Sequence, residues 1–195
     1  MRELILVPIV HLPSDMGSMA AELMKVGKQK LGLEKWKENE AKIQKYWAEV
    51  EQALEKLKLD WSTVRIYQDG LPHAGEELVK RIVEKAEQQQ SQNYKLLKKL
   101  LEKGASIEGT ESPALLVKEF TSIRAWLQSQ DETERKRAKE AYERTKGKLL
   151  NQRDSFIADR INETLKPGET GILFVGAHHQ VGSKLSSDIR VKKLD

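Results

Sequence analysis

The clearest feature of the chain is a set of short strand-like segments, each closed by turn residues. Residues 4–10 and 172–175 are unbroken apolar runs, and residues 61–67 are expected to form a second strand that ends in a polar turn. Apolar residues at successive positions predict strands that are covered on both faces, as in a parallel sheet. Weaker strands are expected at 105–108 and at 189–191, the last of them at a sheet edge. Pro8 predicts a bulge or an irregular end in the first strand, because proline cannot donate to a strand ladder.

Between these segments, apolar residues recur at spacings of three and four, which is typical of amphipathic helices. Trp36, Ile43, Trp47 and Val50 follow this spacing, while lysine and glutamate fill the other positions. Helices are expected at 18–31, about 34–59, 76–90, 92–102, from 113 onward, and at 131–165, where Gly147 is a candidate interruption. Alternation of strands and helices predicts an α/β fold with a small, mostly parallel sheet, helical crossovers and long charged helices. We expect a single domain over residues 1–195, with helical excursions at about 34–59 and 113–165.

Composition narrows the class of protein. The 34 basic and 30 acidic side chains are interleaved along the helices, so the net charge of +4 does not form a phosphate-binding stripe, and nucleic-acid binding is not expected. The absence of cysteine excludes disulfides and thiolate metal sites and is compatible with a reducing cytoplasm. No segment approaches the roughly 20 apolar residues of a membrane span. A soluble cytoplasmic protein is the expectation.

Chemically versatile side chains follow the predicted strands. His11, His73, His178 and His179 each come after a strand, and Glu111 follows the weak strand at 105–108. In a parallel sheet these positions share one edge, where α/β proteins build their sites. Imidazole and carboxylate groups together are suitable ligands for zinc, manganese or iron. A divalent metal site at this edge is therefore the leading hypothesis.

Further candidates lie at the same predicted edge. Gly176 would allow close approach of a ligand to the backbone, and Arg153 could reach the edge from the last crossover helix. Asp69 is a turn former first and a ligand candidate second. A strand-end histidine taken singly is more often a structural group, and Arg153 beside Asp154 is commonly part of a surface ion pair. The chain lacks the G-x-S-x-G elbow, the P-loop lysine and the H-E-x-x-H helix.

Four segments resemble motifs of the TraB/PrgY/Tiki superfamily, which is related to the ChaN-like and erythromycin-esterase-like folds. They are Ile9-Val10-His11, Gly109-Thr110-Glu111-Ser112, Arg153-Asp154, and Val175-Gly176-Ala177-His178-His179. They occur in the same order as in the family. The resemblance covers both ends and the middle of the chain.

The resemblance implies metal-dependent peptidase activity, as found in some members of the superfamily, or regulation of peptide signalling, as in others. By analogy His11 and His179 would be metal ligands, and Glu111 a ligand or the general base. Arg153 would stabilise an oxyanion or hold a substrate carboxylate. The residues themselves leave catalysis and binding both open.

Three functional interpretations follow. The first is a metal-dependent, peptidase-like hydrolase, and the second is a non-catalytic regulatory protein that binds a peptide or small-molecule ligand. In the third, the long charged helices form an oligomerisation or partner-docking module. This interpretation is compatible with a homo-oligomer. Fold alone does not choose among them.

Overall fold

A computed structural model describes residues 1–10, 20–88 and 91–194. Its centre is a five-stranded sheet in the order β3-β2-β4-β1-β5, and every pairing is parallel. The strands are β1 (Arg2–Ile9), β2 (Val64–Gln68), β3 (Ser106–Glu108), β4 (Thr170–Gly176) and β5 (Ile189–Lys193). This confirms the predicted α/β class and the position of the last strand at an edge.

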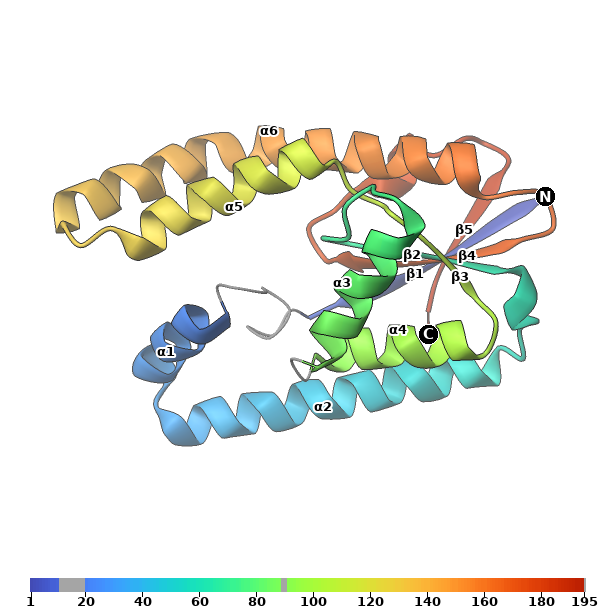
Figure 1. The fold of residues 1–195 in the computed structure, drawn as a ribbon, viewed down its shortest axis with the longest axis horizontal. Helices are drawn as coiled ribbons and strands as arrows, with labels where there is room; N and C mark the ends of the chain where they lie inside the picture. The colour runs from blue at the N-terminus through green and yellow to red at the C-terminus, as the bar shows by residue number, and fades with distance from the viewer. Residues whose placement is uncertain (11–19, 89–90, 195) are drawn as a thin grey trace.

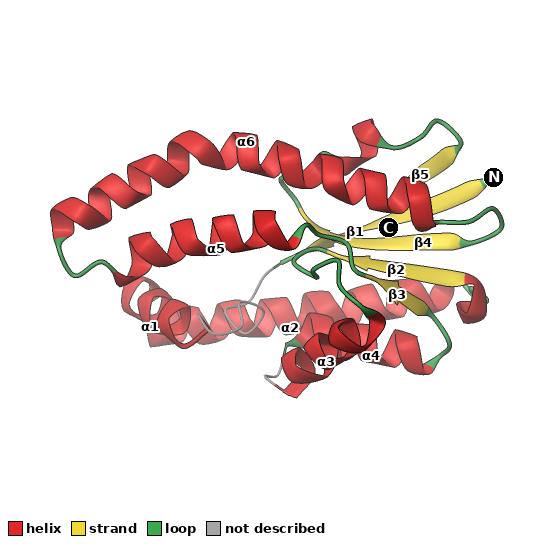
Figure 2. Cartoon of the chain, turned by 45° about the horizontal axis from the view of Figure 1, so that its top comes forward, coloured by secondary structure: helices red, strands yellow, loops and turns green. Residues whose placement is uncertain are grey.

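The helices cover both faces of the sheet (Figure 2). They are α1 (Ala20–Leu31), α2 (Leu33–Lys56), α3 (Glu76–Gln88), α4 (Gln92–Glu102), α5 (Pro113–Gln128) and α6 (Glu132–Thr164). Ile172 and Phe174 of β4 point into a core shared with α2, α3 and α4, whereas Leu173 and Val175 point into one shared with α6. Successive residues of β4 thus enter opposite cores, which is why its sequence is apolar without alternation.

The bulge expected at Pro8 is not formed. Strand β1 keeps its parallel register with β4 as far as Ile9. Leu6 accepts a backbone hydrogen bond from Leu194, so Pro8, two residues further on, faces the same side, beyond the end of β5 at Lys193. The backbone nitrogen of Pro8 therefore points away from β4. Its missing N–H removes no hydrogen bond between β1 and β4, and the strand remains regular.

Helices α5 and α6 form a long antiparallel pair that extends past the sheet (Figure 1). Helix α6 is continuous through Gly147, so the interruption considered there does not occur. The carboxyl half of α6 packs on the sheet through Ile157, Ala158 and Ile161, and its charged amino half pairs with α5. Within the described residues, no helix is both long and apolar enough to cross a bilayer.

Candidate metal centre

The loops that follow β2 and β3 are joined at the carboxyl edge of the sheet. The N–H groups of Thr110 and Glu111 both donate to the carbonyl of Leu71 at 2.9 Å. In return, the N–H of His73 donates to the carbonyl of Glu111 at 2.6 Å, and Pro72 and Glu111 form an isolated parallel bridge. These contacts hold the Glu111 side chain, which is fully buried, above the end of β2.

Gly109 permits this joining, because its Cα lies against the neighbouring loop. A Cβ there would lie 2.5 Å from the carbonyl oxygen of Pro72 and 2.6 Å from Cα of His73. We expect Gly109→Ala to lower the free energy of unfolding by about 1–3 kcal/mol, since backbone must move to relieve the overlap. Gly147→Ala is the control, because its Cβ would meet nothing within 4 Å. In helix α6 it should stabilise by about 0.5–1 kcal/mol. Equal urea-denaturation midpoints for the two variants would contradict the assigned role of Gly109.

Asp69 connects the end of β2 to the end of β4. Its N–H donates to the carbonyl of Phe174 at 2.9 Å, and its Oδ2 accepts from the N–H of Gly176 at 3.1 Å. A Cβ on Gly176 would lie 3.3 Å from this carboxylate oxygen and 3.5 Å from Cδ2 of His179. Gly176, a predicted member of the rim, therefore allows Asp69 and His179 to approach each other closely.

Arg153 on α6 is at the centre of the carboxylates. Its Nη2 lies 2.6 Å from Oδ1 of Asp69 and 2.5 Å from Oε1 of Glu111, and its Nη1 lies 2.5 Å from Oε2 of Glu119. Its Nε also donates to both oxygens of Glu111, at 3.2 and 3.1 Å. One guanidinium thus contacts three carboxylates contributed by the ends of β2 and β3 and by α5.

Asp154, the next residue along α6, holds His179. Its Oδ1 lies 2.5 Å from Nδ1 of the imidazole, and its Oδ2 accepts from the N–H of Gln180 at 2.9 Å. The other ring nitrogen, Nε2, lies 3.3 Å from Oδ2 of Asp69. A carboxylate on one imidazole nitrogen fixes the ring and directs the other nitrogen, an arrangement that recurs around metal-binding histidines.

Burial and charge shift the ionisation of these groups. Burial raises the pKa of Glu111, and the hydrogen bonds and charge of Arg153 oppose the shift only in part. Burial lowers the pKa of Arg153, but its carboxylate neighbours, Glu111 foremost, more than compensate and raise it. Burial also opposes the charged form of His179, yet the hydrogen bonds and charge of Asp69, followed by Asp154, leave its pKa raised. The surroundings therefore favour the protonated forms of Glu111, Arg153 and His179.

Asp69, Glu111 and His179 form a group that could hold a metal ion. Each offers one ligand atom, and these atoms lie within 4.8 Å of one another. One imidazole nitrogen and two carboxylate oxygens suit zinc, manganese or iron, with further coordination positions left for water or substrate. Four carboxylates surround Arg153 and His179 when Asp154 and Glu119 are counted, so an added cation fits the charge balance as well as the donor set.

The predicted site residues have different positions. Glu111, Arg153, His179, Asp69 and Gly176 meet at the carboxyl edge of the sheet. His178 lines the adjacent cavity and is exposed, outside the metal-ligating group. His73 is exposed too, with its ring centroid 6.4 Å from that of Phe156. His11 lies outside the described residues, so its role as a ligand stays a prediction.

Two carboxylates of the centre, Asp154 and Glu119, were not among the predicted site residues. Asp154 is buried at 3% exposure, although its neighbour Arg153 makes the pair resemble a surface ion pair. Glu119 contacts Arg153 from α5. The available signal was helical spacing: Asp154 lies three residues before Ile157 and seven before Ile161, on the side of α6 that packs on the sheet.

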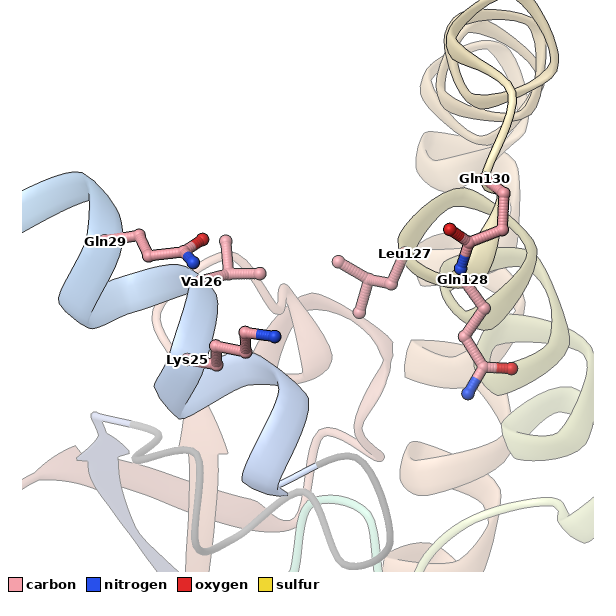
Figure 3. A pocket seen from close by; sticks show the side chains of 6 residues that line it. All are labelled: Lys25, Val26, Gln29, Leu127, Gln128 and Gln130. Atoms are coloured by element: carbon pink, nitrogen blue, oxygen red, sulfur yellow. The ribbon is translucent and has the colours of Figure 1, made fainter.

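A cavity of about 1090 Å³ opens beside this centre. Asp69, Glu119, Arg153 and His179 line its polar end, and apolar side chains of α5 and α6 line much of the rest. A second hollow, of about 510 Å³, lies between α1 and the end of α5 (Figure 3). Among the described residues, those that line this second hollow include neither a carboxylate nor an imidazole, so the candidate metal ligands lie beside the first cavity.

Comparison of the chain with known protein families, with curated proteins and with solved structures finds no match. The function of this centre must therefore be argued from its own geometry.

Proposed function

We propose that the protein is a metal-dependent hydrolase of the peptidase kind, with Asp69, Glu111 and His179 as ligands of a divalent cation. One observation carries the proposal. The imidazole of His179 is held at Nδ1 by Asp154, while its Nε2 faces Asp69 in a group whose three ligand atoms lie within 4.8 Å. A histidine held in this way has its second nitrogen available for a cation.

The bound cation would polarise a carbonyl oxygen and lower the pKa of water toward neutrality. The protein residues then have separate tasks. Asp154 keeps the imidazole oriented. Burial raises the pKa of Glu111, which makes its carboxylate a stronger base and suits it to accept a proton from water. Arg153 provides a fixed positive charge beside the cavity, where it would stabilise negative charge on an oxygen of the substrate.

A non-catalytic binding protein is the second candidate, and Arg153 is the observation that favours it. Its guanidinium already pairs with Asp69 and Glu111, which partly supplies the positive charge that a metal would bring. In that case the polar end of the cavity would recognise a ligand without metal and without turnover. Metal binding separates the two candidates.

The first test is titration of the metal-free protein with zinc and manganese by calorimetry. We expect stoichiometric binding by wild type and a loss of at least about a hundredfold in affinity in His179→Ala, because removal of one ligand leaves only two. His178→Ala is the matched control, since it removes the adjacent, exposed histidine and should leave affinity unchanged. Absence of binding in wild type would overturn the proposal and favour the metal-free binding protein.

Glu111→Gln distinguishes ligand from proton acceptor. If Glu111 is mainly a ligand, the variant loses metal affinity. If it is mainly the base, metal affinity is kept while hydrolysis of a peptide or ester substrate is lost. The same measurement on His11→Ala tests the remaining predicted ligand.

A further inference from the structure

We propose that Asn93 is a specificity-determining residue that reads an amide group of the ligand, and that the cavity wall on α5 selects apolar groups beside that amide. The ligand class is thus a peptide or related amide with large apolar substituents. This deepens the proposed function, because the cavity ends at the candidate metal centre. It concerns binding alone and can be tested without metal or turnover.

The first observation is an unpaired polar group inside the protein. The side chain of Asn93, on α4, is buried, and neither its Oδ1 nor its Nδ2 has a hydrogen-bond partner among the described residues. The Oε1 of Gln68 is likewise buried and unpaired, while its Nε2 donates to the carbonyl of Asp69 at 2.9 Å. Both residues line the cavity. A buried donor or acceptor without a partner costs stability. We therefore infer that a ligand in the cavity forms hydrogen bonds with these atoms.

The chemistry of these atoms favours a ligand group that both donates and accepts hydrogen bonds. Asn93 offers a donor and an acceptor together, and Gln68 adds an acceptor. A carboxylate or phosphate would satisfy only the donor, and an ammonium group only the acceptors. An amide of the ligand satisfies both, since its C=O accepts from Nδ2 of Asn93 and its N–H donates to a free side-chain oxygen.

The second observation is the exposure of α5. This helix contains no buried residue, although it is rich in apolar side chains. Leu116, Phe120 and Ile123 lie four and three residues apart, so they share one face of the helix, and all three line the cavity. Val117, also in the lining, is 63% exposed. An apolar ligand in the cavity would cover this face and supply the burial that α5 lacks.

The two observations meet in a single ligand. The amide-reading atoms lie on α4 and at the end of β2, and the apolar face lies across the same cavity on α5. Asp69 adjoins Gln68 and contacts Arg153, so an amide held at Asn93 belongs to a ligand that can extend to the metal centre. A peptide with bulky apolar side chains has both features in alternation.

The test uses metal-free protein and three probes: N-acetyl-leucyl-leucine amide, its analogue with an ester oxygen in place of the central N–H, and N-acetyl-seryl-serine amide. We expect wild type to bind the dileucine amide at least about tenfold more tightly than the diserine amide, because apolar area is buried only by the first. Replacing the central N–H should cost about tenfold, since an acceptor is left unpaired. Equal affinity for all three probes would overturn the inference.

Asn93→Leu adds a readout that a structural role would not give. If Asn93 serves the ligand, the variant should bind the dileucine amide about tenfold more weakly. The free protein should melt roughly 2–4 °C higher, because a buried unpaired amide is gone. A lower melting temperature with unchanged affinity would show that Asn93 is structural and would overturn its assignment.

A pair of variants on α5 tests the apolar wall separately. Ile123→Asp places a charge in the cavity lining and should abolish the preference for leucine over serine. Thr121→Asp, on the same helix at an exposed position outside the lining, should leave the preference unchanged. If both variants keep the wild-type preference, α5 does not contact the ligand and the assignment of the wall fails.

Discussion

Replacing Arg153 by methionine is expected to lower the free energy of unfolding by about 3–5 kcal/mol, because it leaves buried carboxylates without their counter-charge. Glu111 is fully buried and Asp69 is 5% exposed, so the methionine variant leaves both carboxylates poorly solvated. A loss of this size is a large part of the 5–15 kcal/mol that typically holds a domain folded. Urea denaturation at pH 7 would measure it directly.

Arg160→Met is the matched control for this variant. Arg160 lies on the same helix and pairs with Glu108 at 3.3 Å and with Glu163 at 3.0 Å, but Glu163 is largely exposed. We expect a loss of no more than about 1 kcal/mol, as for other ion pairs in contact with solvent. Similar losses for the two variants would contradict the assigned position of Arg153 at the centre of a buried cluster.

A divalent cation should partly restore the stability of Arg153→Met. Without the guanidinium, Asp69 and Glu111 lose the ion pairs at 2.6 and 2.5 Å that it makes with them. Zinc or manganese would then neutralise them, and the gain in stability on adding metal should exceed that of wild type. An equal gain in both proteins would mean that Arg153 does not compete with the cation.

Much of the fold could be predicted because the strongest signals were local. The apolar run at β4 faces two cores, so its sequence alone indicated a strand covered on both sides. The bulge predicted at Pro8 was wrong. Proline disrupts a sheet only where a neighbouring strand would accept a hydrogen bond from that position, and β5 ends before Pro8. The strand order could not be predicted, since pairing is decided by contacts between distant segments.

The site was predictable only in part, for the same reason. Strand ends indicated that Glu111 and His179 would share an edge, but only the adjacency of β2 and β4 brings Asp69 to His179. Helical spacing indicates only that Asp154 is on the side of α6 that packs on the sheet, whereas its contacts come from the loop after β4, which contributes His179 and Gln180. Its function is therefore a property of the assembled fold rather than of its own segment.

The metal-free and metal-bound proteins are expected to respond to pH in opposite directions. The pKa of His179 is raised above its ordinary value of 6.5 and that of Glu111 above 4.5. Between each ordinary value and the raised one, the folded state binds more protons than the unfolded state. The stability of the metal-free protein should therefore fall as the pH rises, from about 4.5 upward for Glu111 and from about 6.5 upward for His179, by at most about 1.4 kcal/mol per pH unit for each proton.

Saturation with metal should reverse this trend below about pH 6.5, because the cation requires a neutral imidazole and ionised carboxylates and so releases the bound protons. Unfolding free energies measured from pH 5 to pH 8, with and without zinc, should therefore diverge as the pH rises. In His179→Gln the decline of the metal-free protein above pH 6.5 should be smaller than in wild type, whereas His178→Gln, at an exposed position, should retain the full decline. Parallel curves with and without zinc would show that the cation does not bind at the groups whose protons stabilise the metal-free fold.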